Sequence, residues 1–360
     1  MKNQKEQENP RLRQTFLNDI KQGGFFTTLR REWKEIRDFY IDDERIEKLS
    51  DMGRLRRWLY FAFWLMKSLF LKLTPARRLL LLLAIIFSAQ WNQTGAFSGN
   101  LFFAGLLLLF ILMLELKDKL LAKEELDAGR SVQFALMPET MPRVAGWDIW
   151  LYSQPAREVG GDMVDCITVN ANRYALALGD VAGKGLGAAL FMARLQAVLR
   201  ALAPDYEKPA RLIEKINIIF HRDRMPNSFA SLFYLELQPD SDMVKYVNAG
   251  HLPPIVLRQK IFKELEKGQP ALGLMDHTKY TERSFRMKKG EILLVYSDGL
   301  SEAKTEQNAF FGERRIRDIL GLYAHSSAQD IGRHLLLAVK QFINDSALSD
   351  DLSLLIVKKL

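Results

Sequence analysis

The chain has 360 residues, which is enough for more than one domain, and its single cysteine, Cys166, excludes an intrachain disulfide. The net charge is +8, and residues 1–137 carry most of the excess, with 22 Lys or Arg against 16 Asp or Glu. These cations flank an apolar segment and form no nucleic-acid-binding motif, so we expect no nucleic acid partner.

Residues 1–57 are polar, with apolar residues spaced as in short amphipathic helices, and we expect a cytoplasmic helical region there. Residues 58–73 are apolar but contain Lys67 and Lys72. A basic helix rich in Trp and Phe is typical of one that lies in the membrane interface. The alternative is a further membrane span, which would place the N-terminal region outside the cell.

An uncharged stretch covers residues 79–114, and a helix needs about 20 apolar residues to cross a bilayer. Polar residues and glycines between 91 and 100 interrupt it and indicate a turn. The pattern predicts a membrane region at 58–116, with transmembrane helices at 76–93 and 99–116 that form a hairpin. A pair of buried core helices is the alternative. Basic residues before the hairpin favour the cytoplasmic side for both of its ends.

Residues 117–137 are predicted to form a linker helix, which Pro138 ends. Gly129 lies within this helix and weakens it by about 1 kcal/mol relative to alanine. The apolar residues of the linker are spaced too irregularly to require a coiled coil, so a homodimer through this helix stays open.

Segments of strand and helix character alternate in blocks over 138–360, which predicts an α+β domain. The expected strands are 147–153, 163–169, 173–179, 229–237, 243–249, 291–297 and 352–358. The expected helices are 186–202, 208–223, 312–322 and 328–344.

Four acidic clusters in this domain lie far apart in the sequence, each at the expected end of a strand. Carboxylates are the ligands that hard divalent cations prefer, and neighbouring glycines let the backbone approach closely. An Asp-Gly pair alone is usually a turn, but apolar runs lead directly into two of the clusters. The acidic residues are Asp162, Asp165, Asp180, Asp298, Asp350 and Asp351.

A phosphate-binding loop is the competing interpretation of residues 179–185. That motif needs Gly at position 178 and Ser or Thr at position 185, and the chain has Leu178 and Gly185. The loop is therefore excluded.

Five segments, in this order, together resemble one enzyme family. They are PAREVGGD at 155–162, GDVAGKG at 179–185 with AAL at 188–190, YVNAGHLPP at 246–254, VYSDGLSEA at 295–303 and DDLS at 350–353. They resemble the SpoIIE/RsbU-type serine/threonine phosphatases, a bacterial branch of the metal-dependent PPM phosphatases. The resemblance implies two antiparallel sheets packed face to face with helices outside, an α-β-β-α sandwich.

The resemblance also implies a site for two divalent ions, Mn²⁺ or Mg²⁺. Asp180 would bridge the ions, with the carbonyl of Val181 beside it, and Asp162 would contact one of them. Asp298 and Asp350 would hold the other ion. Two such ions, about 3.5–4 Å apart, activate a water for in-line attack on phosphorus.

Residues near the expected ligands have open roles. Arg157 would grip the substrate phosphoryl group, because arginine makes bidentate bonds to phosphate; an ion pair with Glu158 is the alternative. Asp351 is expected beside the ligands rather than among them, and Asp165 is either a ligand or a structural residue.

Two positions bear on proton transfer. His251 would orient a loop or donate a proton. Wider members of the phosphatase family carry a histidine general acid two residues after the bridging aspartate, where this chain has Ala182. The identity of any general acid is therefore open. Cys166 is expected to be a strand residue rather than a nucleophile.

The predicted hairpin and its basic flank, together with the resemblance, predict a phosphatase anchored in the bacterial inner membrane with its catalytic domain in the cytoplasm. Its expected substrate is a phosphorylated STAS-domain protein, an anti-anti-sigma factor of a partner-switching pathway. The alternatives are a scaffold that binds a phosphoprotein with little turnover and a small-molecule phosphoesterase.

Overall fold

The computed structural model covers the whole chain and describes residues 48–49, 52–89, 99–137, 143–223, 228–344 and 347–360. The chain divides into two compact units, Met1–Lys119 and Leu120–Leu360. Most of the predicted N-terminal region, 1–57, and the turn of the predicted hairpin lie outside the described residues.

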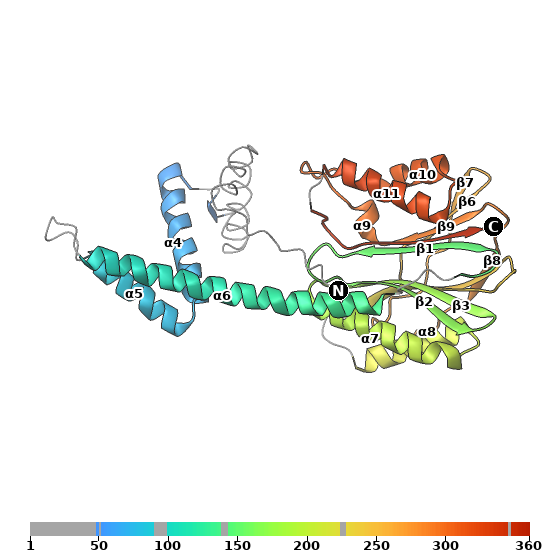
Figure 1. Cartoon of the computed structure of the whole chain (residues 1–360), viewed down its shortest axis with the longest axis horizontal. Coiled ribbons are helices and arrows are strands. Elements are labelled where there is room, and N and C mark those ends of the chain that lie inside the picture. Colours follow the sequence, from blue (N-terminus) through green and yellow to red (C-terminus); the bar gives the residue numbers. More distant parts are fainter. Residues whose placement is uncertain (1–47, 50–51, 90–98, 138–142, 224–227, 345–346) are drawn as a thin grey trace, which may run out of the picture. The chain divides into compact units, whose positions relative to one another are not determined.

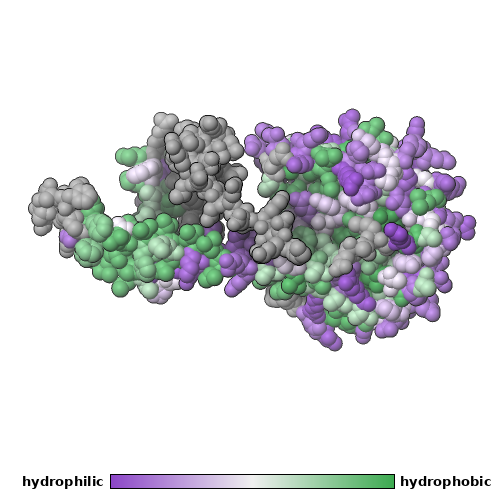
Figure 2. Space-filling view, viewed as in Figure 1, coloured by the Kyte–Doolittle hydropathy of each residue, from purple (hydrophilic) through white to green (hydrophobic). Residues whose placement is uncertain are grey.

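The first unit contains α4 (Arg54–Lys72), α5 (Pro75–Ala89) and the start of α6 (Gly99–Leu136). Helix α5 lies antiparallel to α6, because Arg77 at its start binds Glu115 at 2.7 Å and Phe87 near its end lies 6.4 Å from Phe103 between ring centroids. Large apolar side chains cover the exposed surface of these helices (Figure 2). The described residues therefore form the two arms of a helical hairpin.

Two helices of the described residues are long and apolar enough to cross a membrane, namely Asn100–Leu136 and Leu186–Asp205. The second lies within the other unit, where α7 buries residues such as Phe191 and Leu195 in a core. Its apolar character is therefore explained by packing. The predicted span 99–116 and the predicted linker 117–137 form one continuous helix, α6, because good helix formers continue past Leu116.

The second unit is built on two five-stranded antiparallel sheets stacked face to face (Figure 1). One sheet has the order β1 (Trp147–Gln154), β10 (Leu352–Lys359), β9 (Ile292–Tyr296), β6 (Ile255–Arg258) and β7 (Ile261–Glu264). The other has the order β2 (Asp162–Asn170), β3 (Arg173–Val181), β4 (Ala230–Leu237), β5 (Met243–Ala249) and β8 (Arg283–Arg286).

Helices cover the outer face of each sheet (Figure 1). Helices α10 (Gly312–Leu322) and α11 (Ala328–Phe342) lie on the first sheet, and α7 (Leu186–Leu202) and α8 (Pro209–Arg222) lie on the second. Strand residues alternate between the two faces, so that Met163 packs under α7 and α8 while Val164 packs between the sheets. This is the predicted α-β-β-α sandwich.

The close packing of α11 shows how tightly the layers fit. A Cβ on Gly332 of α11 would lie 1.9 Å from the ring of Trp150 in β1. Only glycine lets the helix approach the sheet at this point.

Every predicted strand and helix of 138–360 is present, with ends shifted by two residues at most. The prediction missed β6, β7 and β8, each four residues long, and the one-turn helix α9 (Asp298–Ser301). These elements are too short for their hydrophobic periodicity to be read.

Candidate active site

Four aspartates from four separate segments come together at one end of the two sheets. Asp162 begins β2 and pairs in register with Asp180 of β3. Asp298 begins α9, with one residue between it and the end of β9, and Asp350 precedes β10, the strand paired with β9. The sandwich thus places one carboxylate pair on each sheet, facing the other.

Burial and mutual repulsion act on these carboxylates. Burial raises the pKa of Asp180 to about 6, helped by the negative charges of Asp298 and Asp350. Burial and the charge of Asp180 raise the pKa of Asp162, which is 3% exposed. Burial and Asp350 raise the pKa of Asp298. The cluster therefore carries negative charge that a bound cation would stabilise.

The donor set suits a hard divalent cation. Oδ2 of Asp162 is buried and has no hydrogen-bond donor among the described residues, and such an orphaned acceptor is costly unless a cation binds it. Oxygen ligands of this kind fit Mg²⁺ or Mn²⁺.

Among the described residues, however, no three side chains of His, Cys, Asp or Glu are already grouped closely enough to hold a metal ion. The assignment of Asp162, Asp180, Asp298, Asp350 and the Val181 carbonyl as ligands therefore stays a prediction.

Asp351 organises the backbone around the cluster. Its carboxylate accepts hydrogen bonds from the backbone N–H groups of Ala156 (2.8 Å) and Gly161 (2.5 Å), while its carbonyl accepts one from the Ser297 hydroxyl (3.0 Å). A Cβ on Gly299 would lie 2.0 Å from this carbonyl, so glycine is required there. Asp351 thus joins the loops that carry Asp162 and Asp298.

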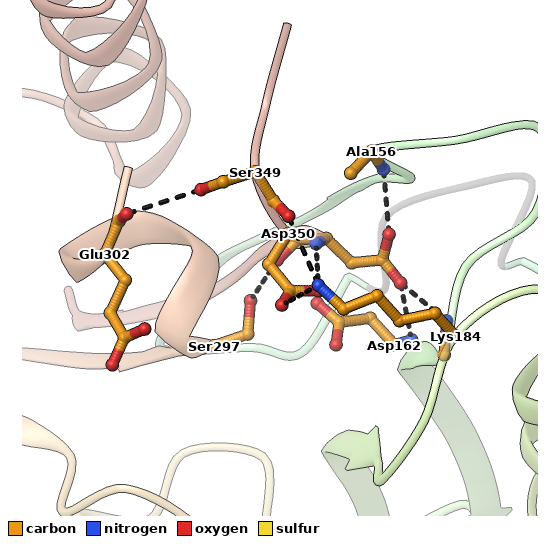
Figure 3. Close-up of polar contacts among 9 residues, drawn as sticks. Ala156, Asp162, Lys184, Ser297, Glu302, Ser349 and Asp350 are labelled. Carbon is orange, nitrogen blue, oxygen red and sulfur yellow. Dashed lines mark hydrogen bonds and ion pairs between the residues drawn. The ribbon is translucent and has the colours of Figure 1, made fainter. Parts of the chain in front are cut away.

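Two cations lie at the edge of the cluster. Arg157 is exposed, and no ion pair to Glu158 or another carboxylate occurs among the described residues. Lys184 donates to Asp350 Oδ2 at 2.7 Å and to the Ser349 carbonyl at 3.3 Å (Figure 3). Both line one small hollow together with Asp350 and Asp351.

No role for Lys184 is predicted from the sequence, where its place between Gly183 and Gly185 indicates only a loop. The φ angles of these glycines, 113° and 77°, favour glycine and turn the loop. The turn at these glycines brings Lys184, which follows β3, to Asp350, which precedes β10.

Asp165 has a structural partner. It is fully buried and receives two hydrogen bonds from the Arg200 guanidinium of α7, at 2.7 and 2.8 Å. Of the two roles left open for Asp165, this geometry favours the structural one, because the side chain ties β2 to α7.

His251 and Cys166 are both held in uncharged forms. The His251 Nδ1 lies 3.0 Å from the Ser231 hydroxyl, and burial lowers the pKa of His251 to about 4. Burial raises the pKa of the Cys166 thiol to about 12. Burial therefore favours the neutral imidazole of His251, which lacks the additional proton of a general acid, and the un-ionised thiol of Cys166, which is a poor nucleophile.

The end of α6 is attached to this site. The Gln133 side chain is buried; its amide donates to the Gly160 carbonyl at 2.8 Å and its oxygen accepts from the Gly160 N–H at 3.1 Å. The Leu136 carbonyl, at the end of the helix, accepts from Gln196 and Arg200 of α7. Gly160 lies two residues before Asp162.

Comparison with known proteins gives a consistent picture. The family described as Stage II sporulation protein E (SpoIIE) matches residues 170–359. Protein IcfG of Synechocystis is 28% identical over 263 residues, which cover 65% of this chain and 41% of IcfG. The chain thus spans less than half of that relative.

Two further matches are similar in extent. The phosphoserine phosphatase RsbU of Bacillus subtilis is 26% identical over 239 residues, covering 66% of this chain and 70% of RsbU. The solved SiaA-PP2C domain of Pseudomonas aeruginosa has a TM-score of 0.59 at 18% identity, and the match covers 68% of this chain and 98% of that domain. The structural match supports the fold.

Proposed function

We propose that this chain, which belongs to the SpoIIE family, is a metal-dependent protein phosphatase that hydrolyses phosphoserine or phosphothreonine in a regulatory phosphoprotein. The observation that carries the proposal is the meeting of four aspartates from both sheets at one end of the sandwich, with Arg157 and Lys184 at its edge.

The aspartates Asp162, Asp180, Asp298 and Asp350 would hold two divalent ions, with the Val181 carbonyl beside them. When bound, such ions supply the Lewis acidity that activates water and offsets phosphoryl charge. Asp180 is paired in register with Asp162 and repelled by Asp298 and Asp350, so it faces both halves of the cluster. This placement supports a bridging role for Asp180.

The side chains of Lys184 and Arg157 complete the charge balance of the site. The four aspartates and Asp351 together carry one more negative charge than two divalent ions neutralise, and Lys184 offsets that excess through Asp350. Arg157 then leaves the site with a positive surplus. Its planar guanidinium would bind two oxygens of the phosphoryl group and hold it for in-line attack.

Protonation of the leaving group has no evident side-chain donor among the described residues. Ala182 cannot supply a proton, and His251 is buried and neutral. The seryl or threonyl oxygen would therefore take its proton from solvent, to which the hollow beside Arg157 opens.

The substrate we propose is a phosphorylated STAS-domain protein, on the likeness to the phosphoserine phosphatase RsbU. The decisive experiment incubates the protein with Mn²⁺ and the phosphoproteins of its own cell. Loss of phosphate from one STAS-domain protein supports the proposal. Binding without turnover would favour the scaffold, and turnover of small phosphoesters alone would favour a small-molecule phosphoesterase.

We further propose that α5 and the first part of α6 anchor the enzyme in the bacterial inner membrane. The apolar surface of this hairpin, in which residues 79–114 carry no charged side chain, and the length of α6 support the proposal. Single cysteines placed near positions 50 and 130, in a Cys166→Ser background, should both resist labelling from outside intact cells. Labelling of one end alone would indicate an odd number of spans.

A further inference from the structure

An apolar groove lies beside the proposed catalytic site, between α11 and the end of β1. Its volume is about 470 Å³, within the range of about 300–1,000 Å³ that is usual for binding pockets. The buried side chains Val339, Ile343 and Leu352 contribute to its lining. Leu337 also lines it and leaves 55% of its surface exposed to solvent.

The groove is continuous with the site that carries the aspartates. Leu352 directly follows Asp350 and Asp351 in the chain. Ala156 lines both the groove and the small hollow of Arg157 and Lys184, and its N–H binds the Asp351 carboxylate (Figure 3). A chain whose phosphate reached the aspartates would therefore have its neighbouring residues within reach of the groove.

The lining selects for an apolar occupant. The described residues that line the groove include no acidic side chain, and Lys340 is the one charged residue among them. The Tyr152 hydroxyl donates to the Gln154 side-chain oxygen at 2.8 Å, and nine of the twelve residues that line the groove are apolar. Leu337 thus adds exposed apolar surface that an apolar side chain of a partner would cover.

We propose that this groove binds an apolar side chain of the substrate protein, close in sequence to the phosphorylated residue. The proposal rests on the protein phosphatase function proposed above. It gives the enzyme a basis for choosing its phosphoprotein that is separate from the phosphoryl site, since Arg157 and the aspartates recognise phosphate alone.

The test compares the full-length protein in detergent with its Leu337→Glu variant. The matched control is Leu322→Glu, which changes a leucine of α10 that is 72% exposed and lines no part of the groove. The probes are synthetic phosphoserine peptides with leucines or serines on either side of the phosphoserine, and p-nitrophenyl phosphate, which is too small to reach beyond the phosphoryl site.

We expect the wild type to hydrolyse the better leucine peptide with a kcat/KM about tenfold above that of its serine counterpart, the gain that one buried apolar group gives. Leu337→Glu should abolish this preference through KM while turnover of p-nitrophenyl phosphate stays unchanged. Leu322→Glu should behave as the wild type.

The proposal would be overturned by a preference that survives in Leu337→Glu, by an equal loss on p-nitrophenyl phosphate, or by a change of oligomeric state, which would make the groove an interface between copies. Turnover of every peptide without preference would also refute the proposed role of the groove, but it would agree with the phosphatase function. Hydrolysis of p-nitrophenyl phosphate with no turnover of any peptide would refute the groove as a peptide-binding site, and the test on the phosphoproteins of the cell would then decide the protein phosphatase function.

Discussion

The carboxylate cluster predicts that Asp180→Asn removes activity and yet stabilises the metal-free protein. In the folded chain the pKa of Asp180 is about 6, against an ordinary value of 3.8. A carboxyl whose pKa is raised on folding binds its proton more tightly in the native state, so ionisation opposes folding. At about 1.4 kcal/mol for each pH unit, the destabilisation is about 3 kcal/mol above pH 6.

The raised pKa of Asp180 determines the pH range in which the stability difference appears. Below about pH 3 the group is protonated in both states and contributes nothing. As pH rises from 4 to 7, the free energy of unfolding of the metal-free wild type should fall, because the unfolded state releases its proton first. The amide that replaces the carboxyl carries no charge, so the gain of Asp180→Asn should be near zero at pH 3 and about 3 kcal/mol at pH 7.5.

Urea unfolding of the unit Leu120–Leu360 in EDTA, followed by tryptophan fluorescence, measures this difference. Asp318→Asn, at an exposed position of α10, is the matched control and should change nothing. With Mn²⁺ added, the wild type should gain stability and the variant should gain much less, since ligand binding to the native state stabilises it. Equal stability of wild type and Asp180→Asn at pH 7.5 in EDTA would refute the electrostatic reasoning.

Two other predictions concern the packing around the site. Arg200→Met leaves the buried Asp165 carboxylate without its ion-pair partner and should lower the free energy of unfolding in urea by about 3–5 kcal/mol. Adding Asp165→Asn should recover part of this loss. An unchanged urea midpoint in Arg200→Met would contradict a stabilising ion pair. Gly129→Ala places its Cβ at ordinary contact distance, 3.8 Å, from Val159 and should stabilise the helix by about 1 kcal/mol. Slower hydrogen exchange in 120–137 and altered basal turnover of the full-length protein are expected, whereas no change in either would make the linker a simple tether.

The sequence predicted the fold well because long elements have a readable period. Helix α10 and strand β5 have the predicted ends, 312–322 and 243–249. The short strands β6, β7 and β8 escaped prediction, since four residues leave too little periodicity to distinguish a strand from a loop.

The site could be predicted in part. Its aspartates follow, precede or begin strands whose apolar runs are visible in the sequence, so their meeting in one cluster could be predicted. Lys184 was not, because its contact with Asp350 depends on two loops that lie 166 residues apart in the chain. The partner of Asp165 was hidden for the same reason: Arg200 reaches it only because α7 packs across β2.

The attachment of α6 explains how a linker could act on chemistry without touching substrate. Gln133 exchanges two hydrogen bonds with Gly160, and a Cβ on Gly160 would lie 2.6 Å from the Asp351 carboxylate. The backbone between the helix and Asp351 is therefore closely packed. A shift of α6 would either move the peptide that precedes Asp162 or break the Gln133 hydrogen bonds. Because a signal shifts such an equilibrium only by its differential affinity for the two states, two such states would differ either in the position of the peptide before Asp162 or in whether Gln133 holds Gly160.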